Sequence, residues 1–197
     1  MEDDYKKDLQ QPRKKTTIKE FFTDDRYRRN TIIMIFLWSA CSFNFYLMNF
    51  QLKYLNASVY YNAYASSISD MVGFSCSAFL YKKVRLRYAF CICYSVSVLG
   101  GLLYLFFGYN LTFEPYFIFL GKLGIAACFN GVYIANNSLY PTTMVSTAFG
   151  MFQVLSRMAT IVAPELAEIE NYLPMTVYVI VGICACLASL LIKTEKM

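Results

Sequence analysis

The feature of this sequence that most restricts its fold is a series of long stretches almost without charged residues. They are Thr31–Leu52, Tyr54–Tyr81, Tyr88–Phe113, Pro115–Ser156 and Asn171–Ile192. Asp70 and Lys122 are the only charged residues within them. Because about 20 mostly apolar residues in a helix cross a bilayer, each stretch is long enough to do so. The sequence therefore predicts an integral, multi-pass membrane protein embedded in a lipid bilayer.

The amino-acid composition excludes several other classes of protein. Hydrophobic residues make up 57% of the chain and charged residues 16%, against about 45–50% and about 25% in soluble domains. Such a chain is too apolar for a secreted disulfide scaffold, a nucleic-acid-binding module or a disordered regulator. Histidine is absent and the seven cysteines lie in apolar stretches, so we expect no metal site and no cofactor.

The longest of these stretches, Pro115–Ser156, must fold back on itself, since it is about twice as long as a membrane span. Pro141 marks the break. We therefore predict an all-α membrane protein with six transmembrane helices. Their expected ranges are 31–51, 59–80, 88–108, 115–137, 144–163 and 173–192. A cytosolic basic segment, residues 1–30, is expected before this bundle of residues 31–192, and a cytosolic tail, residues 193–197, after it.

The distribution of basic residues predicts the orientation of the bundle. Nine of the 18 Lys and Arg residues precede the first predicted helix, and four more lie between the second and third. The first outer loop carries only Lys53. Because basic loops stay on the cytoplasmic side, both termini are expected to be cytosolic. Two glycosylation acceptor patterns, which begin at Asn56 and Asn110, fall in loops that this orientation places outside.

The basic N-terminal segment has some expected order of its own. Thr17-Ile18-Lys19-Glu20 fits a capping box. Ile18, Phe21 and Phe22 would then give the following turns an apolar face on the inner leaflet. The alternative is a solvated, positively charged flank.

Three charged residues, Asp70, Lys122 and Arg157, lie well inside predicted helices. Because charge is costly inside a membrane, each is a functional hypothesis by default. All three fall at middle to outer depth, where one cavity would collect them. If Asp70 pairs with one cation, the other remains available to an anion or a carboxylate. The alternative is an internal salt-bridge cluster that only fixes packing.

Small residues recur every four positions on two predicted helices. They are Ala65, Ser69, Gly73 and Ser77 on one, and Ala127 and Gly131 on the other. Such stripes predict close contacts between helices.

A set of short motifs follows the same order as in a known transporter family. They are Gly121-Lys122, Tyr140-Pro141-Thr142, Gly150, Ser156-Arg157 and Ala163-Pro164. Together they resemble the tenth and eleventh helices of the major facilitator superfamily, specifically its organic cation, anion and carnitine transporter family. Upstream, Phe21-Phe22-Thr23 and Arg28-Arg29 resemble the segment leading into the seventh helix. The resemblance implies that the chain corresponds to helices seven to twelve, the C-terminal six-helix half.

Two departures from the family pattern bear on function. Where the family's turn after the tenth helix carries an acid and an arginine, this chain has Ser138 and Val145. The loop Ser77–Leu86 keeps the family's basic residues but lacks its acid and both glycines. The turn and the loop that gate transport in the family are therefore altered in this chain. The cavity charges are kept, since Asp70 and Arg157 match positions at which family members carry an acid and an arginine.

The resemblance implies transport of a small organic ion, with anions or zwitterions preferred. Transporters of this superfamily combine two six-helix halves around a central site, and this chain would supply one. A hetero-partner, a second copy, or a longer parent chain would supply the other. Lys122 and Arg157 would contact the cargo's negative group, and Asp70 would set the charge balance. We expect no enzyme and no catalytic residue, because transport breaks no bond.

A second function stays open at this point. The chain would then be a structural membrane subunit derived from such a carrier and inactive in transport. The missing half and the altered loops favour it, whereas the cavity charges favour transport. An ion channel is not expected, because the sequence contains no ring of charges and no filter-like loop.

Overall fold

The computed structural model describes residues 18–23, 25–54, 59–107, 113–169 and 172–193, and every regular element within them is helical. The helices are α2 (Ile18–Thr23), α3 (Asp25–Gln51), η1 (Leu52–Tyr54), α4 (Val59–Lys83), α5 (Leu86–Phe107), α6 (Glu114–Leu139), α7 (Thr142–Thr160), α8 (Val162–Ala167) and α9 (Leu173–Leu190). The predicted all-α fold class is confirmed. Asn56, Asn110 and the capping residue Thr17 lie outside the described residues.

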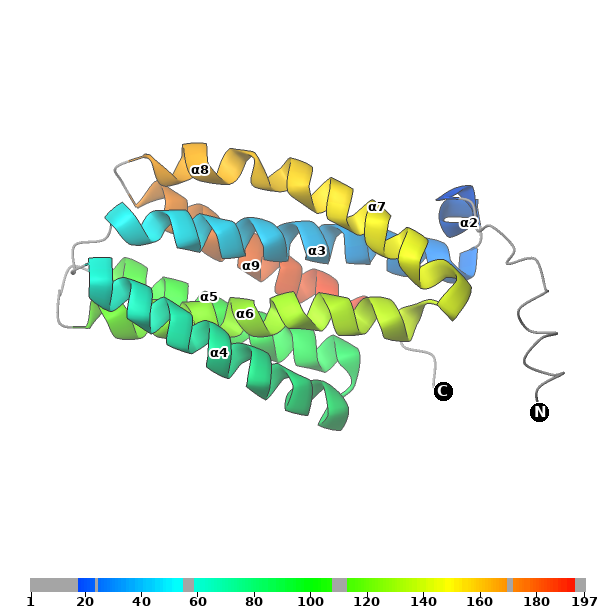
Figure 1. The fold of residues 1–197 in the computed structure, drawn as a ribbon, viewed down its shortest axis with the longest axis horizontal. Coiled ribbons are helices and arrows are strands. Elements are labelled where there is room, and N and C mark those ends of the chain that lie inside the picture. The colour runs from blue at the N-terminus through cyan, green and yellow to red at the C-terminus, as the bar shows by residue number, and fades with distance from the viewer. Residues whose placement is uncertain (1–17, 24, 55–58, 108–112, 170–171, 194–197) are drawn as a thin grey trace, which may run out of the picture.

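The long helices run side by side along one axis (Figure 1). α3 packs against α6, α7, α8 and α9, and α6 packs between α4 and α5. α5 also packs against α9, whereas the consecutive helices α4 and α5 make little contact. Because packing order differs from chain order, residues far apart in the sequence meet inside the bundle.

Five helices among the described residues are long and apolar enough to cross a membrane, so our prediction of six was wrong by this criterion. α4 is the helix that does not qualify, although its 25 residues are long enough. Its first half contains Asn62, Ser66, Ser69 and Asp70, which lower its hydropathy. The first three of these side chains are buried within the protein. The polarity of α4 therefore faces other helices.

Several helix ends follow from proline, as the sequence predicts. Pro115 and Pro174 lie in the first turns of α6 and α9, where a missing N–H costs little. Pro141 precedes α7 and separates it from α6. Two boundaries differ from the predictions. α3 begins at Asp25, and the helix predicted over residues 144–163 is split at Ile161, because Pro164 has no N–H for the carbonyl one turn earlier.

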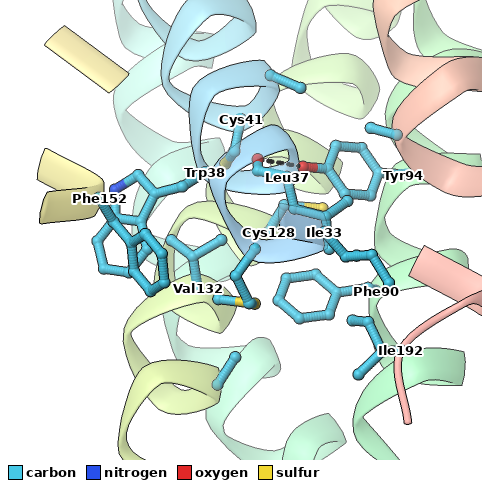
Figure 2. Close-up of a cluster of buried hydrophobic side chains, with 14 of the residues drawn as sticks. Ile33, Leu37, Trp38, Cys41, Phe90, Tyr94, Cys128, Val132, Phe152 and Ile192 are labelled. Carbon is cyan, nitrogen blue, oxygen red and sulfur yellow. Dashed lines mark hydrogen bonds between the residues drawn. The ribbon is translucent and has the colours of Figure 1, made fainter. Parts of the chain in front are cut away.

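The larger hydrophobic core lies around the fully buried Trp38 of α3. The Trp38 ring lies 5.0 Å from that of Tyr133 and 5.5 Å from that of Phe152, so α3, α6 and α7 meet there. On the other side of α3, the Tyr94 hydroxyl of α5 donates to the Leu37 carbonyl at 3.0 Å (Figure 2). This bond satisfies a buried hydroxyl and ties α5 to α3.

The short helix α2 contributes Phe21 to the core, whereas its neighbour Phe22 is exposed. Phe21 is fully buried, and its ring lies 5.6 Å from that of Tyr140. The Tyr140 hydroxyl shares a hydrogen bond of 3.0 Å with Thr31. Burial raises the pKa of Tyr140 to about 12, against the opposing effect of this hydrogen bond. Tyr140 therefore stays protonated at neutral pH and closes this end of the bundle together with Phe21.

The close helix contacts predicted from the small residues are confirmed. A methyl group at Gly73 of α4 would lie 2.8 Å from the Leu123 carbonyl oxygen of α6. The same pair of helices is joined by Asn130, whose amide donates to the Ser77 hydroxyl at 2.7 Å. Glycine and serine thus allow the two backbones to approach.

We expect Gly124→Ala to destabilise the bundle by about 1–3 kcal/mol. Its new methyl group would lie 2.6 Å from the Cys93 carbonyl oxygen and 2.7 Å from the Ser97 Cα, both backbone atoms of α5. Gly150→Ala on α7 is the matched control, since nothing lies within 4 Å of its added methyl group. That change should stabilise the helix by about 0.5–1 kcal/mol. Thermal unfolding in detergent measures the change in stability of each variant. Equal shifts of the unfolding temperature would contradict the close contact between α5 and α6 at Gly124.

Candidate functional site

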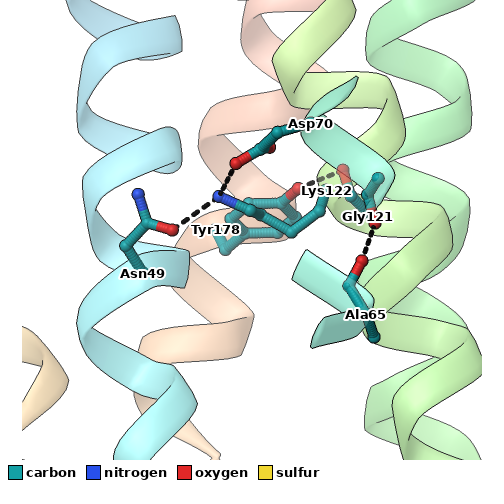
Figure 3. Close-up of polar contacts among 7 residues, drawn as sticks. Asn49, Ala65, Asp70, Gly121, Lys122 and Tyr178 are labelled. Atoms are coloured by element: carbon teal, nitrogen blue, oxygen red, sulfur yellow. Dashed lines mark hydrogen bonds and ion pairs between the residues drawn. The ribbon is translucent and has the colours of Figure 1, made fainter. Parts of the chain in front are cut away.

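Asp70 and Lys122 form an ion pair inside the bundle, between α4 and α6 (Figure 3). The Lys122 ammonium lies 3.3 Å from a carboxylate oxygen of Asp70 and donates to the Asn49 side-chain oxygen at 2.6 Å. It also lies 4.0 Å from the centre of the Phe45 ring. The Lys122 side chain is fully buried, whereas that of Asp70 is 24% exposed. The ammonium is therefore surrounded by groups of its own chain, whereas the Asp70 side chain is partly exposed, with its Oδ1 buried and without a hydrogen-bond partner.

Arg157 lies on the exposed face of α7 and is held by Tyr46 of α3. Its guanidinium donates to the Tyr46 hydroxyl at 2.5 Å and lies 5.2 Å from the centre of the same ring. One tyrosine thus supplies a hydrogen bond and a cation–π contact. These contacts orient the guanidinium without neutralising it.

Phe45 and Tyr46 connect the two charged groups across α3. The Phe45 ring lies against Lys122, the Tyr46 ring lies against Arg157, and the two rings are 5.9 Å apart. Of the three predicted site residues, the structure brings Asp70 and Lys122 into direct contact. Arg157 lies apart from this pair, since its described partner is Tyr46 rather than Asp70.

The sequence analysis missed several polar and aromatic residues of this region. Asn49 is bonded to Lys122, and Gln153 donates to the Tyr133 hydroxyl at 3.1 Å. Helical spacing contains the signal that would have found them. Asn49 lies four residues after Phe45 on α3, and Gln153 lies four residues before Arg157 on α7, so each pair shares a helix face.

Tyr178 of α9 supports the α6 backbone next to Lys122. Its hydroxyl donates to the Gly121 carbonyl at 3.1 Å and also contacts the Ser97 hydroxyl of α5. The Tyr178 carbonyl accepts a bond of 3.1 Å from the Asn44 amide of α3. One buried tyrosine therefore links α3, α5, α6 and α9 directly behind the ion pair.

The turn between α6 and α7 contains local hydrogen bonds where the resemblance led us to look for a charge lock. The Ser138 hydroxyl donates to the Ala135 carbonyl at 3.1 Å, and the Asn136 amide donates to the Val145 carbonyl at 3.2 Å. These bonds fix the turn within the chain. Among the described residues, no three His, Cys, Asp or Glu side chains lie close enough together to hold a metal ion.

Comparison with known proteins agrees with this arrangement of apolar helices and buried charges. The profile of the Major Facilitator Superfamily matches residues 2–164. Solute carrier family 22 member 15 of Xenopus tropicalis is 28% identical over 177 residues, which cover 84% of this chain and 33% of that protein. Solute carrier family 22 member 4 of Mus musculus is 25% identical, with coverage of 85% and 31%. Organic cation/carnitine transporter 2 of Homo sapiens is 24% identical, with coverage of 83% and 30%.

The chain thus spans about a third of the length of the curated relatives that it matches. The profile, in contrast, covers most of this chain. That superfamily consists of membrane transporters rather than enzymes, which accounts for the apolar helices. The chain belongs to the Major Facilitator Superfamily, with solute carrier family 22 among its relatives.

Proposed function

We propose that this chain is the C-terminal six-helix half of a facilitator-type carrier for a small organic ion, with anions or zwitterions preferred. The relatives named for organic cation and carnitine transport support an organic ion as cargo. The proposed preference for anions or zwitterions rests on the position of Arg157. It is an exposed guanidinium on a membrane-spanning helix with no carboxylate partner among the described residues.

In this proposal Lys122 and Asp70 have separate roles. The Lys122 ammonium is fully buried and bonded to Asp70 and Asn49, so it positions the carboxylate and neutralises it. Asp70 is partly exposed and meets any cationic end of a zwitterion. The charges of the buried pair sum to zero. Arg157 alone then sets the excess positive charge of the surface that meets the cargo, which we call the cargo face.

A second half is required to complete the site. Only 17% of the apolar window of the α7–α8 segment is buried in this bundle, against 61% of that of α3. The same segment carries Arg157, which is costly against lipid. A hetero-partner, a second copy of this chain, or the rest of a longer chain would cover the face formed by α4 and α7.

A structural role without transport is the second candidate. Its support is the Asp70–Lys122 pair, which satisfies two of the three intramembrane charges without any cargo. The local hydrogen bonds of Ser138 and Asn136 are the other support.

The carrier proposal predicts that the chain purifies as a complex and that the complex transports. Crosslinking and native mass spectrometry in mild detergent should show a dimer or a hetero-complex. The same complex in vesicles should take up labelled organic anions with saturation. A stable monomer would contradict both candidates, and a stable complex without saturable uptake would favour the structural one.

The orientation predicts the accessibility of the loops at the two ends of the bundle. We propose that Arg85 lies on the cytosolic side and Lys53 on the opposite side. A membrane-impermeant thiol reagent added outside should label Lys53→Cys and leave Arg85→Cys unlabelled. Peptide mass spectrometry distinguishes these positions from the native cysteines. The reverse labelling pattern would invert the proposed orientation.

A further inference from the structure

A cavity of about 720 Å³ lies at one end of the bundle, where α4 turns into α5 and α6 turns into α7. In Figure 1 this is the end where the α6–α7 turn lies. Its walls come from the start of α3, from Val84–Leu86, from Asn137–Thr142 and from Lys193. Lys193 is held there by the Asn30 side chain, which donates to its carbonyl at 2.9 Å and accepts from its N–H at 3.1 Å. Four segments distant in sequence therefore build one cavity.

The charged side chains of this cavity are mostly basic. Arg29, Arg85 and Lys193 line it, together with one acid, Asp25. Asp25 already pairs with Arg28 at 2.7 Å. Within the part of the chain that the structure describes, no carboxylate pairs with any of the three lining cations. The cavity therefore has an excess of positive charge.

The helix ends add hydrogen-bond donors but little net charge. α3, α5 and α7 begin at this end of the bundle, whereas α4, α6 and α9 end there, so their dipoles largely cancel. The first N–H groups of any helix nevertheless lack partners within it. Leu86 and Thr142, the first residues of α5 and α7, both line the cavity, and α7 has no side-chain cap. The first residues of two helices thus lie at the same cavity as the three cations.

The surroundings of the cavity are those of a membrane surface. Lys83 lies 4.3 Å from the centre of the Phe79 ring, and Arg87 lies 4.7 Å from that of Tyr88. Both rings are exposed, and aromatic and basic side chains of this kind gather at the level of lipid headgroups. The apolar flanks of α4 and α5 start directly beside them.

We propose that this cavity binds a multiply charged phosphate group, as carried by the headgroup of an anionic phospholipid. Three cations around one volume match the several oxygens of a phosphate better than the single charge of a carboxylate. Basic pockets between transmembrane helices on the cytoplasmic side recognise such headgroups. A soluble organic phosphate offers the same chemistry, and the test separates the two sources.

The test measures lipid binding by the full chain in the complex in which it purifies. Native mass spectrometry would follow titration with phosphatidylinositol bisphosphate and, separately, with phosphatidylcholine. The variant Arg29→Gln/Arg85→Gln/Lys193→Gln should bind the phosphorylated lipid about 100-fold more weakly, at about fivefold per cation. The matched control, Lys82→Gln/Lys83→Gln/Arg87→Gln, removes three cations from the same end that neither line the cavity nor pair with its acid. This control variant should bind the phosphorylated lipid less than about tenfold more weakly, because salt screens distant charges.

Two results would overturn the proposal. One is an equal loss in the two triple variants, which would reduce the effect to general surface charge. The other is unchanged binding in the cavity variant. All three lining cations are exposed, so we expect the unfolding temperature to stay the same. If the triple variant fails to fold, Arg85→Gln and Arg29→Gln alone should each show the fivefold loss, and no loss in either would also overturn it.

Competition then separates the two sources of phosphate. Inositol trisphosphate shares the headgroup but lacks acyl chains, and inorganic phosphate lacks both the inositol ring and the acyl chains. If the site serves a membrane lipid, neither should displace the lipid at equal concentration. Displacement by inositol trisphosphate at equal concentration would support the phosphate site and assign it to a soluble ligand.

Discussion

Replacing Arg157 by alanine is expected to lower the saturable uptake of organic anions by about 10- to 100-fold. A hydrogen bond to a charged group contributes about 1.5–3 kcal/mol, and Arg157 is the cation of the cargo face that is both exposed and without a described carboxylate partner. Arg157→Asp should go further and shift the preference toward cations, because the same position would then repel anions. Uptake of labelled anionic and cationic solutes in vesicles, normalised to folded complex, measures both effects.

Arg87→Ala is the matched control for Arg157→Ala. Arg87 also stacks on a tyrosine, with its guanidinium 4.7 Å from the centre of the Tyr88 ring, but it lies at the end of the bundle. Its loss should leave uptake unchanged. Tyr46→Phe keeps the ring under Arg157 and removes the hydroxyl that accepts its hydrogen bond. Uptake of organic anions should therefore fall about fivefold. Unchanged uptake in Arg157→Ala would remove its assigned role.

Breaking the Asp70–Lys122 pair is expected to destabilise the bundle, by an amount that depends on which of the two residues is replaced. Asp70→Asn leaves a fully buried ammonium with only neutral acceptors, so we expect a loss of about 3–5 kcal/mol. Lys122→Met leaves the carboxylate of a side chain that is 24% exposed, so the loss should be smaller, about 1–3 kcal/mol. Thermal unfolding in detergent gives both values.

The double variant Asp70→Asn/Lys122→Met tests whether the two residues act as a pair. It removes both charges, and its stability should return to within about 1 kcal/mol of the parent. Asn130→Leu is the control at the same interface, where a neutral hydrogen bond to Ser77 is lost at a cost of about 1 kcal/mol. Additive losses from the two single variants would show that the ion pair contributes no coupling.

Much of the fold follows from the sequence, because length and hydropathy alone decide which segments cross a membrane. The break at Pro141 and the helix starts at Pro115 and Pro174 are predictable for the same reason, since proline has a local effect. α4 was counted among the crossing helices on its low charge. Its serines and asparagine lower its hydropathy below that of the other long helices, which the sequence already shows. That these side chains are buried depends on neighbours that the sequence does not reveal.

The partners of the site residues are not predictable in this way. The sequence singles out Asp70, Lys122 and Arg157 by their charge, and its stripes of small residues predict close helix contacts without saying which helices they join. The backbone approach of α4 and α6 at Gly73 places Asp70 beside Lys122, whereas the separate packing of α7 on α3 places Arg157 beside Tyr46. Phe21 is a similar case. Its place against Tyr140 depends on a turn more than 100 residues later, whereas local pattern indicated only an apolar face.

The pair of hydrogen bonds between Asn30 and Lys193 joins residues 163 positions apart. During synthesis, Asn30 therefore leaves the ribosome long before its partner exists. α3 is in the same position, since most of its neighbours, α6 to α9, follow it in the chain. Non-local contacts of this kind form slowly, and exposed intermediates are prone to misassembly. Within this chain α3 is made before α9, so the contacts that hold α3 in the bundle form only after the later helices have been inserted.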